Sequence, residues 1–191
     1  KQNNLILFYG KNEGLKKKTI KDLIKNEKGS ILNYEEKEII DNQILFVENL
    51  LSRSLFETKK IIIIKRVTDK IINFIDEIKT KNLDDILIIL ETGNLEKKSK
   101  LRANFEKDKN YICVAFYPDN EQTLSKLAFS FFREKNITIS QENINVIVSR
   151  SNGDRENLYN ELNKIEFFSK NGKTITNENI SKLSNLNENY A

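Results

Sequence analysis

Four consecutive isoleucines at residues 61–64 constrain the fold more than any other stretch of this sequence. β-Branched side chains favour strands, and a strand that is apolar at every position must be covered on both of its faces. Between this run and the others, apolar residues recur at helical spacing, as at Ile71, Phe74, Ile75 and Ile78. The other apolar runs lie at residues 5–9, 30–34, 85–90 and 111–116. This alternation predicts an α/β fold with a five-stranded parallel sheet and flanking helices.

The pattern changes after Pro118, where the strands stop and helical periodicity continues. A first helix is expected to bury Leu124, Leu127, Ala128 and Phe131. Three further periodic segments each follow a suitable N-cap residue, namely Ser140, Asp154 and Thr176. The sequence therefore predicts an α/β domain over residues 1–118 and a small helical-bundle domain over residues 119–191.

Composition limits the classes of function. The chain of 191 residues has a formal net charge of +4, but its 28 acidic residues are interspersed with 32 basic ones, so binding to phosphate backbones is permitted and not demanded. The single cysteine, Cys113, excludes an internal disulfide and is expected to be a buried structural thiol. No apolar run approaches the ~20 residues of a membrane span, and no signal-peptide pattern is present. We expect a cytoplasmic protein without membrane contact.

A helix-period segment leads directly into the isoleucine strand. Asp41 is a suitable N-cap for it, and its buried face is expected at Ile44, Val47 and Leu51. Leu55 and Phe56 follow in the short connection before the strand. On the pattern alone, such an apolar pair packs the junction between helix and strand.

The turn after the first strand resembles a phosphate-binding loop that has lost essential residues. Aligning the pattern GxxxxGK[ST] on Gly10 places Leu15 at the second glycine, Lys16 at the lysine and Lys17 at the magnesium-binding hydroxyl. Leu15 carries a Cβ where the backbone must approach the phosphates, and Lys17 brings a cation to the metal position. A solvated helix face is the ordinary interpretation of Lys16.

The third strand has also lost the residues that hydrolysis would need. Lys65 and Arg66 follow the isoleucines, where a nucleotide hydrolase needs acidic residues to hold magnesium and orient water. The absence of histidine leaves few groups for nucleophilic or metal chemistry. We therefore expect a scaffold derived from a nucleotide hydrolase, with no catalytic residues, no metal and no cofactor.

Four segments, taken in order, resemble the delta subunits of bacterial DNA polymerase III, which belong to the loader of the sliding clamp. They are LFYGKNEG, SLFETKKIIIIK, LIILETGNLEKKSKL and SQENINVIVSRSNGDRENLYNELNKI. The most specific element is SLF before an apolar strand, and the last segment resembles the helical lid of the family with its Gly-Asp turn. The resemblance spans nearly the whole chain.

The resemblance implies an AAA+-type domain and a lid, followed in the family by a collar domain that residues 1–191 do not reach. Delta subunits neither bind nor hydrolyse ATP. They open the ring-shaped beta clamp by inserting a hydrophobic pair into a pocket on it, and that pair corresponds to Leu55 and Phe56. The family often has a further apolar residue two positions earlier, where this chain has Arg53, followed by Ser54. Further partners implied are clamp-loader subunits of the gamma/tau and delta-prime types, and primed DNA.

The resemblance also locates the positions at which AAA+ proteins sense nucleotide. Asn94 follows the fourth strand where a polar sensor stands, and without nucleotide it is expected to be a turn residue. Arg155 lies one place before the sensor arginine of the lid, and Glu156 occupies that place. The approach to the fifth strand, KDKNYIC, lacks the Ser-Arg-Cys element that donates an arginine finger in sister subunits.

Two other functions fit parts of the sequence. One is an active P-loop ATPase with a degenerate loop, which would use Lys16. The other is a basic module that binds nucleic acid through Lys16, Lys17, Lys18, Lys97, Lys98, Lys100 and Arg102.

Overall fold

The computed structural model describes residues 4–52, 59–172 and 175–184. The chain forms two compact units. The first comprises Lys1–Lys11 and Lys16–Phe116, and the second comprises Asn12–Leu15 and Tyr117–Ala191.

The first unit is built on a sheet of five parallel strands in the order β2-β3-β4-β1-β5. Their bounds are β1 (Leu5–Tyr9), β2 (Ser30–Glu35), β3 (Lys60–Lys65), β4 (Ile86–Thr92) and β5 (Ile112–Ala115). The predicted five-stranded parallel sheet is confirmed. Because β1 pairs with both β4 and β5, the loop after β1 begins in the interior of the sheet.

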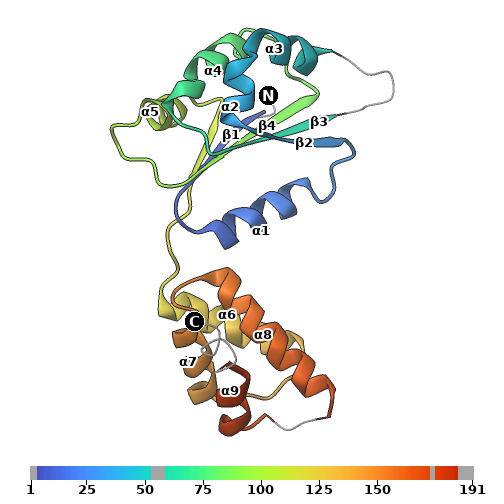
Figure 1. Ribbon diagram of the computed structural model, residues 1–191, viewed down its shortest axis with the longest axis vertical. Coiled ribbons are helices and arrows are strands. Elements are labelled where there is room, and N and C mark those ends of the chain that lie inside the picture. The colour runs from blue at the N-terminus through green and yellow to red at the C-terminus, as the bar shows by residue number, and fades with distance from the viewer. Residues whose placement is uncertain (1–3, 53–58, 173–174, 185–191) are drawn as a thin grey trace. The chain divides into compact units, whose positions relative to one another are not determined.

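Helices cover both faces of this sheet, as Figure 1 shows. α1 (Glu13–Ile24) lies on one side. The other side carries the remaining helices of the unit, which are α2 (Glu36–Asp41), α3 (Gln43–Leu51), the 3₁₀ turn η1 (Asp69–Ile71), α4 (Ile72–Ile78) and α5 (Lys100–Lys107).

Both faces of β1, β3 and β4 are buried, as their continuous apolar runs predict, whereas Ile31 and Leu32 of the edge strand β2 are exposed. Leu5, Leu7, Ile62 and Ile64 point into the core beneath α2–α5, where Phe74 and Phe105 pack against them. The intervening Ile6, Ile61 and Ile63 are also at most 5% exposed. Since successive side chains of a strand point to opposite faces, these residues belong to the side covered by α1.

The segment before β3 differs from the expectation. Asp41 does not cap a helix; it is the last residue of α2, which begins with a capping box between Glu35 and Glu38. Asn42, with φ −139°, separates α2 from α3 and changes the direction of the buried face. Val47 and Leu50 are therefore buried, whereas Ile44 is 75% exposed.

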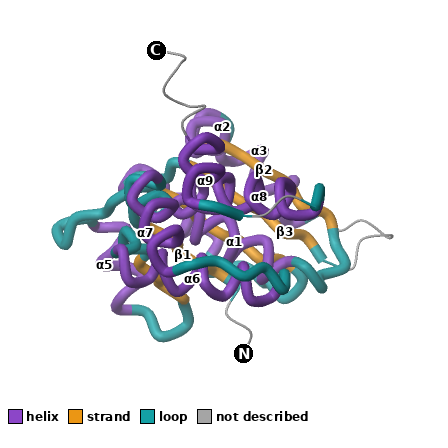
Figure 2. Tube along the Cα trace, turned by 90° about the horizontal axis from the view of Figure 1, so that it is seen from below, coloured by secondary structure: helices purple, strands orange, loops and turns teal. Residues whose placement is uncertain are grey.

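The second unit contains a helical bundle formed by α6 (Glu121–Glu134), α7 (Gln141–Arg150), α8 (Arg155–Lys170) and α9 (Asn177–Ser184). Figure 2 shows α7 and α9 side by side. Ser140, Asp154 and Thr176 each accept a hydrogen bond from a backbone N–H three residues later, which confirms the predicted N-caps. On α6 the buried aromatic residue is Phe132, and Phe131 lies at the edge of the core.

Within residues 4–52, 59–172 and 175–184, no helix is both long enough and apolar enough to cross a bilayer.

Asp69 fixes the connection after β3 to the start of α5. Its carboxylate accepts hydrogen bonds from the backbone N–H of Leu101 at 2.9 Å, from the Ser99 hydroxyl at 2.7 Å and from the Lys100 N–H at 3.1 Å. The Leu101 and Ser99 bonds lower the pKa of Asp69 below its usual range, and slight burial opposes them. The carboxylate thus satisfies amides at a helix N-terminus that have no partner inside the helix.

We predict that Asp69→Ala lowers the free energy of unfolding by about 1–2 kcal/mol at neutral pH, because these amides lose their acceptor. Since folding lowers the pKa of Asp69, its contribution is complete above the unfolded-state pKa and disappears as the pH falls through the folded-state value. The difference between wild type and variant should therefore shrink in acid. Urea unfolding followed by circular dichroism at several pH values measures it.

Asp84→Ala is the matched control, because Asp84 is an exposed aspartate in the loop before β4. It should change stability by less than about 0.5 kcal/mol. Equal effects of the two substitutions would contradict the capping role of Asp69.

Candidate functional site

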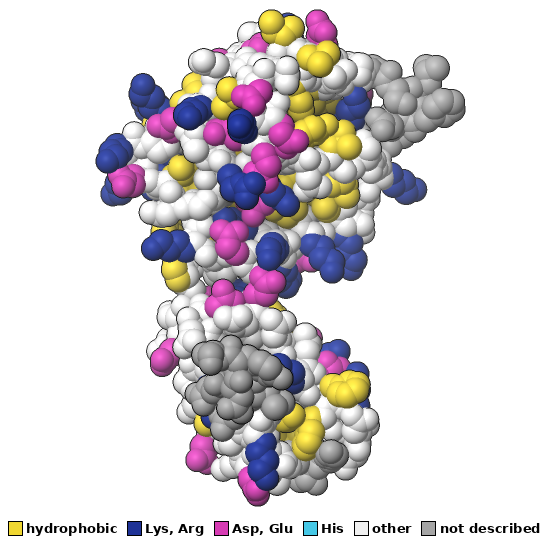
Figure 3. Space-filling model, in the orientation of Figure 1, with side chains coloured by type: hydrophobic (Ala, Val, Ile, Leu, Met, Phe, Trp, Pro, Cys, Tyr) yellow, Lys and Arg dark blue, Asp and Glu magenta, His cyan; other side chains and the backbone are white. Residues whose placement is uncertain are grey.

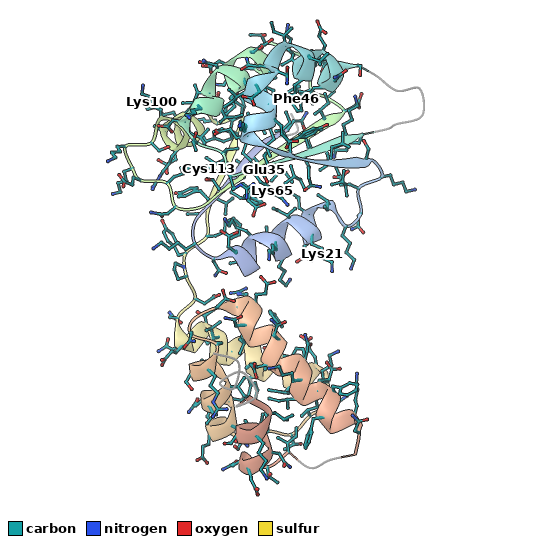
Figure 4. All side chains as sticks on the ribbon, viewed as in Figure 1. Lys21, Glu35, Phe46, Lys65, Lys100 and Cys113 are labelled. Atoms are coloured by element: carbon teal, nitrogen blue, oxygen red, sulfur yellow. The ribbon has the colours of Figure 1, made fainter. Side chains whose placement is uncertain are left out.

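The carboxyl ends of β1, β3 and β4 form the edge at which parallel α/β sheets bind ligands. The loop after β1 and the residues after β3 both lie at this edge. Figure 4 shows Glu35 and Lys65 close together there, at the ends of the paired strands β2 and β3. Gly10, Lys65, Arg66 and Asn94 lie at or just after the ends of β1, β3 and β4 and therefore belong to this edge.

Gly10 ends β1 in a backbone conformation that only glycine adopts readily, with φ +126°. Its N–H donates to the carbonyl of Gly93 at 2.8 Å. A Cβ at this position would lie 2.2 Å from the carbonyl oxygen of Phe116. A glycine is therefore required at position 10 because the backbone passes close to that of Gly93 and Phe116 there, whether or not a phosphate binds.

The loop uses its polar groups internally. The side-chain oxygen of Asn12 accepts a hydrogen bond from the Leu15 N–H at 3.1 Å, so an amide at the start of α1 is already satisfied. Glu13 is the first residue of α1 and places a negative charge where a helix N-terminus would attract an anion. Lys17 is exposed on α1, at the position where the phosphate-loop pattern has a magnesium ligand.

Lys16 is buried, with 1% of its surface exposed, so its interpretation as a solvated helix residue is wrong. Its ammonium group donates to the carbonyl oxygen of Thr92, at the end of β4, over 2.7 Å. A charged group this deeply buried requires polar partners, because desolvation would otherwise be prohibitive. The lysine therefore joins α1 to β4.

Lys65 and Arg66 are both exposed at the end of β3. Arg66 adopts a left-handed conformation, with φ +56°, and its guanidinium pairs with the Glu35 carboxylate at 2.8 Å. Lys65 lies beside Glu91 in the register of β3 and β4. Cationic side chains thus follow this strand where a magnesium-dependent hydrolase would need carboxylates.

The two sensor positions differ from each other in the structure. Asn94 is exposed in the loop after β4. Arg155, the first residue of α8, is only 9% exposed and forms a two-pronged ion pair with Asp119. Asp119 also accepts a hydrogen bond from the Asn12 side chain at 2.8 Å. Sequence reasoning singled out Arg155 but missed Asp119 and Asn12, since no local pattern links positions 36 and 107 residues apart.

Leu55 and Phe56, with Arg53 and Ser54, lie outside the described residues. Their segment is bounded by Ser52, just after α3, and by β3. The ammonium of Lys60 donates to the carbonyl oxygens of Asn49 at 3.0 Å and Leu50 at 3.4 Å, and also to that of Ser52. The residue that opens β3 therefore caps the end of α3.

Metal and nucleophile chemistry find little support in the described residues. In residues 4–52, 59–172 and 175–184 there is no group of three histidine, cysteine, aspartate or glutamate side chains that could hold a metal ion. Cys113 is half-buried against the core of the sheet. Burial raises the pKa of its thiol to about 11, with a contribution from Glu106 that Arg102 partly opposes. Little thiolate forms at neutral pH.

Several basic side chains that could have formed a nucleic-acid surface have acidic partners. Lys18 pairs with Asp22, Lys98 with Glu96, and Arg102 with Glu106, at 2.7, 2.9 and 2.7 Å. Acidic and basic side chains are mixed over the face shown in Figure 3. Lys100 has a different environment, since it lines a surface hollow along α5 together with Ala103, Asn104, Lys107, Asp108 and Lys109.

Comparison with known proteins identifies a relative that aligns with most of the chain. No protein-family model matches the chain. A protein of Rickettsia prowazekii described as a probable DNA polymerase III subunit delta is 24% identical over 180 residues, which are 93% of this chain and 54% of that protein. The chain is similar to DNA polymerase III delta subunits. It spans about half the length of this curated relative.

Solved structures show the same fold. The Bacillus subtilis DNA clamp loader delta protein superposes with a TM-score of 0.58 at 14% identity, over 86% of this chain and 53% of that one. The Thermotoga maritima RuvB Holliday junction branch migration motor gives a TM-score of 0.60 at 14% identity, over 96% and 61%. The chain therefore has an AAA+-type fold, as its motifs predicted.

We predict that Lys16→Met destabilises the protein by about 1–3 kcal/mol, because the Thr92 carbonyl loses its buried donor. Lys16→Ala should cost more, since it also removes the aliphatic stem from a packed site. Thermal unfolding followed by circular dichroism measures both variants. Lys17→Ala, on the exposed neighbour, is the control and should shift stability by less than about 0.5 kcal/mol.

The same variants distinguish the structural role of Lys16 from an ATPase role. Isothermal titration of wild type with ATP and magnesium should show no saturable binding, because the lysine is held by Thr92. Micromolar ATP affinity that Lys16→Met abolishes, without a change in stability, would contradict this interpretation.

Proposed function

We propose that this chain forms the AAA+-type and lid domains of a clamp-loader delta subunit. It binds a beta sliding clamp through Leu55 and Phe56, favours the open ring, and hydrolyses no ATP itself. The observation that carries the proposal is the similarity to a probable DNA polymerase III delta subunit along 93% of the chain. The AAA+-type fold is compatible with it, although RuvB shares that fold.

The loop geometry supports a role without nucleotide hydrolysis. Lys16 is committed to the Thr92 carbonyl, and Lys65 and Arg66 stand where hydrolysis would need carboxylates. The residues at the motif positions and the contacts at the same edge of the sheet therefore both argue against nucleotide hydrolysis. They disfavour the alternative of an active P-loop ATPase.

The flanks of residues 53–58 support a role in presenting a binding pair. The ammonium of Lys60 bonds to carbonyl oxygens at the end of α3, so the two ends of the connection are tied together. A short segment between fixed ends loses less conformational freedom on binding than one between independent ends. Leu55 and Phe56 belong to this connection.

A leucine and a phenylalanine contribute enough free energy to anchor a contact. Full burial of such side chains is worth about 1.5–3 kcal/mol each. A small apolar cluster of this kind can dominate an interface when the surrounding surface is complementary. To open a ring, the chain must bind the open geometry more tightly than the closed one, because a ligand shifts an equilibrium only by its differential affinity.

The assembly that we propose contains further partners. The relative is nearly twice as long as the aligned region, which leaves room for a collar domain that joins subunits of the gamma/tau and delta-prime types. Primed DNA would lie within the assembled loader. The surface hollow along α5, with Lys100, Lys107 and Lys109, is the described feature that best supports a DNA contact.

We predict that Leu55→Ala with Phe56→Ala lowers clamp affinity at least a hundredfold, because both anchors are lost. Surface plasmon resonance on an immobilised beta clamp measures this, and circular dichroism checks the fold. Ile44→Ala with Leu45→Ala is the matched control, since these exposed apolar residues of α3 are 75% and 57% accessible. The control should retain wild-type affinity.

The outcomes separate clamp contact from core packing. A folded double variant that binds the clamp as wild type does would refute the proposed contact. Unfolding of the Leu55–Phe56 variant, with the control unaffected, would instead assign the pair to the junction between helix and strand.

We further predict that Lys60→Met weakens clamp binding by about fivefold, because the end of α3 loses its cap and the segment must be ordered on binding. Lys59→Met is the control, since the neighbouring ammonium pairs with Glu27 at 2.8 Å. Equal clamp affinities of the two variants would show that the cap does not help to present the pair.

A further inference from the structure

Asp119 is the centre of a buried polar cluster within the second unit. One of its oxygens accepts hydrogen bonds from Asn12 Nδ2 and from Arg155 Nε, both at 2.8 Å, and the other accepts from the second prong of Arg155. The Asp119 side chain is 6% exposed and that of Arg155 is 9% exposed. Asn12 is also buried.

The three residues come from three separated parts of the chain. Asn12 belongs to the loop after β1, Asp119 precedes α6, and Arg155 begins α8. Asn12 additionally donates to the Tyr117 carbonyl at 3.0 Å. Segment Asn12–Leu15 belongs to the same compact unit as the helical bundle, so the cluster joins the loop to the bundle from within that unit.

Close packing accompanies these polar contacts. A Cβ added to Gly14 would lie 3.2 Å from the Glu156 N and 3.3 Å from the Arg155 Cβ. The loop backbone therefore approaches the first turn of α8 closely. In the phosphate-loop pattern, the backbone amides of such a loop would face a bound phosphate.

We propose that Asp119 is an internal anion that takes the place of a ligand oxyanion between the loop and the first turn of α8. Its carboxylate accepts hydrogen bonds from two nitrogens of the Arg155 guanidinium and from the side-chain amide of Asn12. The contact between the loop and the bundle is thereby built into the chain and does not require nucleotide. This role concerns the scaffold and is independent of clamp binding by Leu55 and Phe56.

The charge state of Asp119 agrees with this role. Burial alone would raise the pKa of Asp119, but hydrogen bonds from Arg155 and Asn12, together with attraction by the guanidinium, lower it below its usual range. The carboxylate is therefore charged at neutral pH. Removing it would leave the Arg155 guanidinium buried without its anion.

Chemical rescue tests the proposal. Asp119→Ala should lower Tm by about 10 °C, because a buried ion pair loses one partner. Sodium formate supplies a free carboxylate, and it should raise the Tm of this variant saturably towards the wild-type value. Sodium chloride at equal ionic strength should not do so, and formate should leave the wild-type Tm nearly unchanged.

Two controls show whether rescue uses this site. In Asp22→Ala the lost carboxylate belonged to an exposed pair with Lys18 on α1, so formate should produce no saturable gain. In the double variant Asp119→Ala with Arg155→Met the guanidinium is gone, and formate should fail to rescue.

The proposal is overturned if Asp119→Ala has the wild-type Tm, or if formate stabilises every variant equally. If Asp119→Ala does not fold in buffer, refolding it in formate replaces the melting experiment. Recovery of the helical circular dichroism signal in formate, but not in chloride, is then the expected result, and failure in both salts overturns the proposal.

Discussion

The hydrogen bonds between the loop after β1 and the end of β4 determine which groups of the loop can meet a ligand. The Gly10 N–H bonds to Gly93, and the Lys16 ammonium bonds to Thr92, so both groups of the loop turn onto the neighbouring strand. In a phosphate-binding loop these groups would serve a ligand. In this structure they bond to backbone carbonyl oxygens of Gly93 and Thr92.

The sequence predicted the inner strands well because both of their faces are buried, which leaves uninterrupted apolar runs such as residues 61–64. It failed where a contact depends on tertiary placement. Ile44 has the spacing of a core residue but is exposed, because the helix break at Asn42 changes which face of α3 meets the core. Lys16 has the composition of a surface residue but is buried, because its partner is a backbone carbonyl 76 residues away.

At the candidate site, too, some features are visible in the sequence and others depend on tertiary placement. The substitutions at Leu15, Lys17, Lys65 and Arg66 are visible in the sequence because a known motif defines what those positions need. The cluster around Asp119 has no such template, and its members are remote in sequence. A motif can therefore show which of its residues a chain lacks, whereas contacts between residues remote in sequence emerge only from the fold. The contact proposed for Leu55 and Phe56 rests on resemblance and stays a prediction, since two apolar residues carry no distinctive chemistry.

These features lead to a mechanical account of the chain. A protein that works by binding one geometry of a partner needs stiff supports around its contact residues, because motion in the supports reduces the differential affinity that it can apply. Lys60 is such a support, because it ties the ends of the connection that carries the apolar pair. The Asp119 cluster is a separate tie, which joins the loop to the bundle within the second unit. Both ties use groups of the chain itself. Under the proposed function, the tie made by Lys60 would hold the supports of the apolar pair in place, and partners would control access to the pair.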